Sequence, residues 1–293
     1  MNVMANPANP VVPLPAKRLK ATIAIALLLG VAGMGLMGCE TVGKVGDAGG
    51  DTESYQVSST DISSLSSVIE KNPNDPEAWN MRGSAYARSG QYGPAVADFN
   101  RALQLDPNSA QALANRALVY RKTNQPDLAL ADYNHVISVD PNYAPAYVGR
   151  GNIYRLQGQT QQAMADYDKA IQIKPETAEA YYNRGLIRQA AANHEVAIDD
   201  FTSAISNDPL AEAPYYSRGT SYLVLKKYKE ALADFNQALQ INNRNAASWA
   251  GRGLAQAGMG DTDKARDSYH RALSIDSGNA AAKNGLAQLG NNS

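Results

Sequence analysis

The chain has 293 residues, of which 44% are hydrophobic, and its 27 basic side chains are balanced by 28 acidic ones. That length suits one large or two ordinary domains. The balanced charge excludes a protein that binds nucleic acid through bulk positive charge, and the single cysteine excludes an internal disulfide or a zinc site made of cysteines.

The first predicted element is a secretory signal peptide over residues 1–38. A basic cluster at positions 17–20 precedes an uncharged apolar run over 21–38, which is the order of a signal peptide. The run ends in Leu-Met-Gly before Cys39 and resembles the lipobox of bacterial lipoproteins. The resemblance implies cleavage before Cys39 and a lipid on that residue. An uncleaved signal anchor is the alternative, because 18 apolar residues just reach the length of a spanning helix.

Residues 39–59 follow as a predicted flexible tether, because they are rich in Gly and Ser and show no helical period. Glu40 stands directly after the cysteine, where an Asp would suggest retention in the inner membrane in many Gram-negative systems. We therefore expect the protein at the bacterial outer membrane, anchored by lipid and facing the periplasm.

From residue 76 the sequence repeats with a period of 34 residues. The six units cover 76–279 and begin at Pro76, Ala110, Ala144, Ala178, Glu212 and Ala246. Each unit has a large residue at its fourth place, a small one at its eighth, and an apolar i, i+4, i+7 stripe in its second half. Gly or Asn stands between the two halves at Gly90, Asn124, Gly158 and Gly260, where a left-handed residue ends a helix. The pattern predicts two amphipathic helices in each unit.

This pattern resembles the tetratricopeptide repeat (TPR) at its hallmark positions. The resemblance implies an all-α fold, a right-handed superhelix (α-solenoid) of antiparallel helix pairs whose first helices line a concave groove. Residues 60–75 are interpreted as a degenerate half repeat before the six units. Residues 280–293 are interpreted as a capping helix and tail.

Arginine occupies the seventh place of all six units, and aspartate occupies the twenty-third place of five. The arginines are Arg82, Arg116, Arg150, Arg184, Arg218 and Arg252, and the aspartates are Asp98, Asp132, Asp166, Asp200 and Asp234. The arginines are either a ladder for an acidic ligand or partners of the aspartates between packed helices. Equal spacing in every unit favours the second interpretation, because scaffolds are periodic and binding sites are local.

Motifs for catalysis are missing from the sequence, which has no P-loop, no H-E-x-x-H and no G-x-S-x-G. His135, His194 and His270 fall at three different places of the repeat, so they cannot form a metal site within one unit. We expect no enzyme activity, no cofactor and no metal.

The resemblance places ligand-facing side chains at the second, fifth, ninth and twelfth places of each unit. In the middle units it selects Arg121, Asn152, Arg155, Tyr182, Leu186, Gln189 and Tyr216. Arginine suits a carboxylate and tyrosine suits apolar packing, so this mixture predicts a groove for an extended peptide or flexible protein tail.

The sequence therefore predicts a lipid-anchored, non-catalytic scaffold that binds envelope proteins or peptides and no nucleic acid; a homodimer stays open. In plan it is similar to the NlpI-type outer-membrane lipoproteins, which implies an adaptor for peptidoglycan hydrolases and their processing protease. Two alternatives are a pilotin-like lipoprotein for secretin or pilus assembly, and a structural part of an outer-membrane assembly complex.

Overall fold

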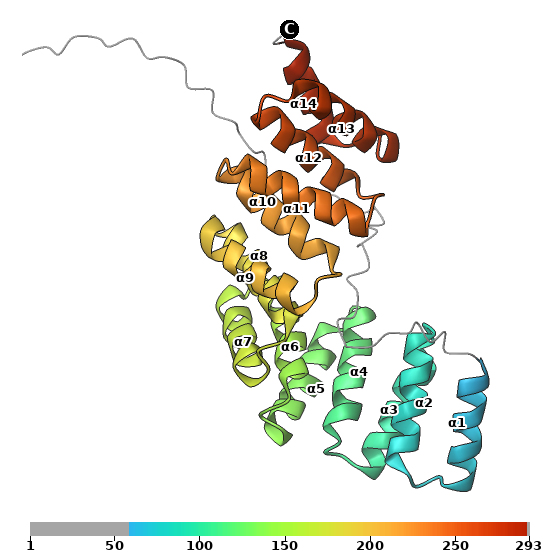
Figure 1. The fold of residues 1–293 in the computed structure, drawn as a ribbon. Coiled ribbons are helices and arrows are strands. Elements are labelled where there is room, and N and C mark those ends of the chain that lie inside the picture. Colours follow the sequence, from blue (N-terminus) through green and yellow to red (C-terminus); the bar gives the residue numbers. More distant parts are fainter. Residues whose placement is uncertain (1–58, 292–293) are drawn as a thin grey trace, which may run out of the picture. The chain divides into compact units, whose positions relative to one another are not determined.

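The computed structural model of the protein describes residues 59–291, and the predicted signal peptide, Cys39 and nearly all of the tether lie outside them. The described part is all-α, as predicted, and successive helices follow one another in space in chain order (Figure 1). The helices are α1 Ser59–Lys71, α2 Pro76–Arg88, α3 Tyr92–Leu105, α4 Ala110–Lys122, α5 Pro126–Val139, α6 Ala144–Leu156, α7 Thr160–Ile173, α8 Ala178–Ala190, α9 His194–Asn207, α10 Glu212–Val224, α11 Tyr228–Ile241, α12 Ala246–Gly258, α13 Thr262–Ile275 and α14 Ala280–Asn291.

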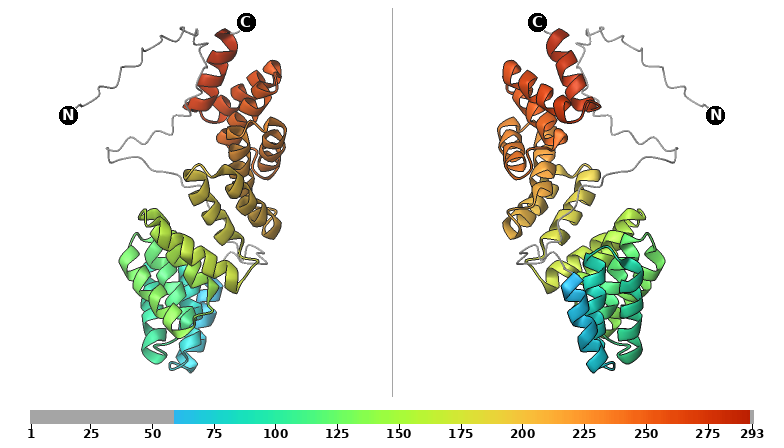
Figure 2. Two further views of the ribbon diagram at one scale, coloured as in Figure 1. Left: turned by 90° about the vertical axis from the view of Figure 1, so that its left-hand side faces the viewer. Right: turned by 90° about the vertical axis from the view of Figure 1, so that its right-hand side faces the viewer.

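Each of the six units forms one helix pair, from α2 with α3 to α12 with α13, and the start of every first helix coincides with the predicted start of its unit. Figure 2 shows the pairs stacked side by side from α2 to α13. α1 packs on α2 in the segment interpreted as a half repeat, and α14 packs on α12 and α13 in the segment interpreted as a cap. None of the helices between residues 59 and 291 has the length and hydropathy needed to cross a bilayer.

Local sequence explains where the helices begin. The Asp75 carboxylate accepts a hydrogen bond from the Glu77 backbone N–H at the start of α2, and the Ser109 hydroxyl accepts one from the Ala112 N–H at the start of α4. Both bonds satisfy donors that a helix N-terminus leaves free. Pro76 at the first position of α2 loses no hydrogen bond there.

The turns inside the units have the predicted left-handed residue. The φ angles are +78° at Gly90, +57° at Asn124, +73° at Gly158 and +86° at Gly260. Units 4 and 5 use Ala192 and Lys226 at the same place, with φ of +60° and +58°, which the sequence alone did not indicate. A residue with a Cβ is strained there, so the fold and not the local sequence imposes this conformation.

Close approach of the two helices in a unit explains the glycine at the eighth place. A Cβ added to Gly151 would lie 2.9 Å from the Tyr167 ring, and one added to Gly185 would lie 2.7 Å from the Phe201 ring. The core between the helices is made of these rings and of alanines such as Ala163 and Ala197, which are completely buried. A side chain at these glycines would force the ring or the helix to shift, whereas unit 2 accommodates the small, completely buried Ala117 at this place.

Candidate functional site

The first helices of the units form the inner side of the stack. Successive first helices contact one another from α2 to α12, whereas successive second helices make no such contacts in the described part of the chain. A stack in which only one row of helices touches curves towards that row. The first helices therefore line the concave side, and we call their surface from α4 to α10 the inner face.

The seventh-place arginines are part of the scaffold, as predicted. In units 1 to 5 the guanidinium forms two hydrogen bonds with the aspartate of the same unit, for example Arg150 Nη2 to Asp166 Oδ1 at 2.7 Å and Arg150 Nε to Asp166 Oδ2 at 2.9 Å. The Arg150 side chain is 19% exposed and that of Asp166 is 6% exposed. The corresponding pairs are Arg82–Asp98, Arg116–Asp132, Arg184–Asp200 and Arg218–Asp234.

The same arginines also connect neighbouring units. The Nη1 of Arg150 donates to Asn134 Oδ1 at 2.7 Å, and Asn134 belongs to the second helix of the preceding unit. Arg116 and Arg218 make the equivalent bond to Asn100 and Thr202. In units 2 to 5 each guanidinium thus holds the second helices of two successive units, and it is not available as a ladder for ligands.

Two of the predicted ligand-facing residues hold first helices together. Asn152 Nδ2 on α6 donates to Glu179 Oε1 on α8 at 2.8 Å, and its Oδ1 accepts from the Tyr167 hydroxyl at 2.8 Å. Gln189 Nε2 on α8 donates to the Ser217 carbonyl at 2.8 Å and to the Ser221 hydroxyl at 2.9 Å, both on α10. Both amides are therefore occupied within the scaffold.

Tyr182 and Tyr216 pack against rings of the second helices. The ring centroids of Tyr182 and Phe201 are 6.0 Å apart, and those of Tyr216 and Phe235 are 5.9 Å apart. Burial raises the pKa of both tyrosines, so both hydroxyls are protonated at neutral pH. Each ring keeps a partly exposed edge, which can pack against an apolar group of a partner.

Arg121 and Arg155 are the two cations of the predicted site. They occupy the twelfth place of units 2 and 3, on adjacent first helices, and neither forms a salt bridge with any residue between 59 and 291. Both lie near the buried Tyr167 hydroxyl: burial raises the pKa of this tyrosine, and the charge of Arg155, its hydrogen bond with the tyrosine and the charge of Arg121 oppose that shift. The inner face thus carries positive charge at α4 and α6.

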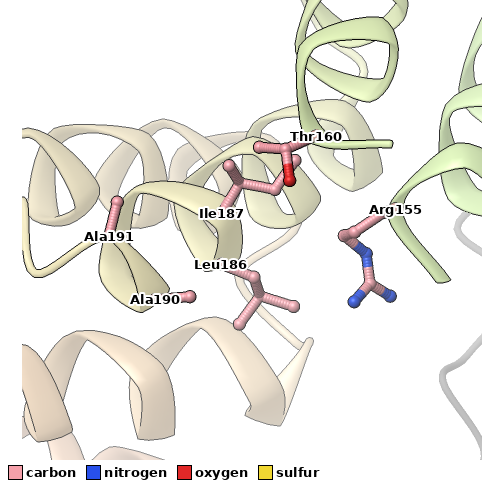
Figure 3. A pocket seen from close by; sticks show the side chains of 6 residues that line it. All are labelled: Arg155, Thr160, Leu186, Ile187, Ala190 and Ala191. Carbon is pink, nitrogen blue, oxygen red and sulfur yellow. The ribbon is translucent and has the colours of Figure 1, made fainter. Parts of the chain in front are cut away.

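A pocket of about 430 Å³ opens next to Arg155. Arg155 comes from the end of α6, Thr160 from the start of α7, and Leu186, Ile187, Ala190 and Ala191 from α8 and the turn that follows it (Figure 3). Sequence reasoning selected Arg155 and Leu186 but missed the rest of this pocket. A signal existed: the thirteenth place is Arg88 and Lys122 in units 1 and 2, but it becomes apolar at Leu156, Ala190 and Val224.

The three histidines all lie on second helices, His135 on α5, His194 at the start of α9 and His270 on α13. His135 Nε2 is 3.2 Å from Asn108 Oδ1, and His270 is exposed. Among the described residues, no group of three or more His, Cys, Asp or Glu side chains is placed to hold a metal ion.

Family models of the tetratricopeptide repeat match nearly the whole repeat region. Those described as tetratricopeptide repeat cover residues 76–109, 110–143, 132–165, 178–209, 213–245 and 246–279, and one described as TPR repeat covers 151–190. A search of curated proteins found no significant match.

Solved structures share the fold at low sequence identity. The structure of pilF from Pseudomonas aeruginosa is 20% identical, with a TM-score of 0.68 over 73% of this chain and 97% of that chain. PilW, a widely conserved type IV pilus biogenesis factor, is 17% identical, with a TM-score of 0.62 over 72% of this chain and 98% of that chain.

A chain of the APC/C hetero-tetramer Cut9–Hcn1 is 17% identical, with a TM-score of 0.66 over 77% of this chain. The matched region spans only 44% of that longer chain. These likenesses establish the fold alone. Together with the family matches over all six units, they show that the chain belongs to the tetratricopeptide-repeat proteins.

Proposed function

We propose that the protein is a non-catalytic scaffold that binds an extended segment of a partner protein along the inner face. The observation that carries this proposal is the combination of an open pocket with two cations, Arg121 and Arg155, that no carboxylate of the described chain neutralises. The scaffold arginines at the seventh place are all bonded to other side chains, whereas Arg121 and Arg155 form no salt bridge with residues 59–291. Repeats of this family typically serve as interaction scaffolds.

The test compares two double variants with the same change in charge. Arg121→Ala with Arg155→Ala removes both inner-face cations and should weaken partner binding at least about tenfold, because one decade corresponds to about 1.4 kcal/mol and an anchor residue is worth about 2 kcal/mol. Arg101→Ala with Lys169→Ala removes two cations of the second helices, which donate to Gln104 and Gln172 on their own helices, and should change binding little.

The partner for this measurement comes from affinity purification of the full-length protein from membranes, followed by isothermal titration calorimetry of the purified pair. Equal loss of affinity in the two double variants would place the binding surface elsewhere. Equal helicity of all proteins by circular dichroism is the control for folding.

Lipid anchoring at Cys39 belongs to the same proposal. Its support is the lipobox-like sequence and the position of the only cysteine of the chain. Radiolabelled palmitate should label the wild-type protein in cells and leave the Cys39→Ser variant unlabelled. Label on the Cys39→Ser variant would show that the lipid is not attached at Cys39.

A second candidate is a role in pilus biogenesis. It is supported by the likeness to pilF and PilW, because the match covers nearly the full length of each of those two chains. An adaptor for peptidoglycan hydrolases and a protease, as in the NlpI-type lipoproteins, rests on the shared plan of anchor, tether and repeats. Affinity purification separates these roles, because it returns pilus or secretin components in one case and hydrolases or a protease in the other.

A further inference from the structure

The pocket beside Arg155 has an apolar floor and a polar rim. Leu186, Ile187, Ala190 and Ala191 supply only hydrocarbon, and the Leu186 side chain extends from α8 towards the side on which Arg155 lies (Figure 3). The volume of about 430 Å³ lies within the range of about 300–1,000 Å³ that is usual for ligand pockets. It is large enough for an aliphatic side chain together with the backbone that carries it.

Arg155 at the rim has unused hydrogen-bonding capacity. Its Nε is buried and has no hydrogen-bond partner among the described residues. A buried donor without a partner is costly, at about 1–3 kcal/mol, and such groups are rare in folded proteins. The Glu179 carboxylate acts electrostatically on Tyr167, as Arg155 does, but it accepts a hydrogen bond from Asn152 and forms no salt bridge with Arg155.

Arg121, one unit earlier, is a second cation without a salt bridge among residues 59–291. It has the same place on α4 that Arg155 has on α6, and α4 and α6 are in contact. Packed helix axes lie about 8–10 Å apart. An extended chain advances about 3.3–3.6 Å per residue and presents every second side chain to the same side, so two carboxylates two residues apart in an extended partner could reach the two arginines.

We propose that the pocket binds an aliphatic side chain of an extended partner segment, and that neighbouring acidic side chains of this segment pair with Arg155 and Arg121. This inference rests on the proposed function. Two cations spaced along the inner face favour acidic side chains within a segment over a single terminal carboxylate. The specificity is therefore for an acidic segment with one apolar anchor.

The probe is a phage-displayed library of random 12-residue peptides, selected on the immobilised full-length protein. The enriched peptides should share an aliphatic residue with Asp or Glu within about three residues of it. Fluorescence anisotropy with one enriched peptide should show at least tenfold weaker binding when its acidic residues are replaced by glutamine, and weaker binding as salt is raised.

Two variants test the two parts of the site. Arg155→Glu should weaken binding of the enriched peptide at least tenfold, and a new selection on this variant should favour peptides with basic residues. Ala190→Trp, at an exposed position of the pocket wall, should weaken binding of the enriched peptide. It should have little effect on binding of the same peptide with glycine in place of its aliphatic residue. Arg88→Glu is the matched control, because Arg88 is an exposed cation near the end of α2, three units from α8.

Three results would overturn the inference. Enriched peptides without acidic residues, or a consensus that Arg155→Glu leaves unchanged, would remove the role of the cations while leaving the inner face as a binding surface. Competition by laurate as strong as that by the unlabelled peptide would make the pocket a lipid site. Failure to enrich any peptide would count against both this inference and the proposed function.

Discussion

The seventh-place arginine has different partners in units 1 to 5 and in unit 6. In units 1 to 5 the seventh-place arginine is paired with an aspartate, whereas Arg252 in unit 6 faces Ser268 and its Nε donates to the Ser268 hydroxyl at 3.1 Å. The hydrogen bond to Asp166 is the largest of the causes that raise the pKa of Arg150, whereas burial lowers that of Arg252. The arginine thus persists where its counter-charge is lost.

Aromatic contact explains why arginine is still useful in unit 6. The Arg252 guanidinium lies 4.0 Å from the Trp249 ring centroid, and the corresponding arginines also lie over rings, such as Arg150 at 5.6 Å from Tyr147. Such cation–π contacts contribute about 0.5–2 kcal/mol depending on exposure. The comparison teaches that this position has two separable functions, a charge pair and a packing contact, and that unit 6 retains only the second.

The largest effect should follow from Arg150→Ala in unit 3. This change leaves the buried Asp166 carboxylate without its cation, which typically costs about 3–5 kcal/mol. The free energy of unfolding from urea titration followed by circular dichroism should fall by that amount. If the loss were under about 1 kcal/mol, the charge pair would not be the stabilising part of the contact.

Arg252→Ala is the matched change in unit 6, and it should cost less. It removes the bond to Ser268 and the contact with Trp249 but leaves no buried carboxylate unpaired, so about 1–2 kcal/mol is expected. Hydrogen exchange read by mass spectrometry should show faster exchange in α12 to α14 only. A loss as large as that of Arg150→Ala would mean that an unseen counter-charge serves Arg252.

Alkaline pH should affect both regions alike, because each has a buried tyrosine. Burial raises the pKa of Tyr133 and of Tyr269 to about 12 from 10. Below pH 10 these tyrosines are protonated in both the folded and the unfolded protein. Between pH 10 and 12 the unfolded chain loses the proton first, so the free energy of unfolding falls as pH rises. At pH 11 each tyrosine should account for about 1 kcal/mol of the loss relative to pH 9.

The measurement is the pH dependence of urea unfolding for the wild type, Tyr133→Phe and Tyr269→Phe. Each variant should lose less stability between pH 9 and pH 11 than the wild type. A variant with the full wild-type loss would show that its tyrosine ionises in the folded protein as easily as in water.

The smallest effect is expected from Ser268→Asp, which gives unit 6 the charge pair of the other units. Ser268 is completely buried and also donates to Gln256 Oε1, so a carboxylate there needs the Gln256 amide to turn over. Replacing a satisfied neutral contact by a buried ion pair gives little net stability. We expect a gain of under about 1 kcal/mol in urea unfolding, and a clear loss would mean that Gln256 cannot adapt.

The fold was predictable from the sequence because its period is local. Four of the six units carry a Gly or Asn at the turn, five carry the glycine for close approach, and the period places the starts of all six first helices. Ala192 and Lys226 were missed as left-handed residues, because neither type prefers that conformation and the packed helices on both sides impose it.

The candidate site was only partly predictable, because it depends on how units meet. A place in the repeat says which helix face a residue occupies, but not whether a neighbouring unit binds its side chain. Asn152 and Gln189 were expected to face a ligand and instead bond to α8 and α10. Gly149 was not singled out, yet a Cβ there would meet the ring of Tyr133 in the preceding unit.

The double attachment of each scaffold arginine limits how such a protein can change in length. Arg150 bonds to Asn134, 16 positions before it, and to Asp166, 16 positions after it. Duplicating or deleting one complete block of 34 residues keeps both 16-residue spacings for the arginines of units 2 to 5. An insertion of any other length between the two helices of a unit separates a guanidinium from its carboxylate. Gene duplication can therefore lengthen the array in whole repeats, whereas an insertion that shifts one helix along its neighbour, within a unit or between units, would break one of the two attachments.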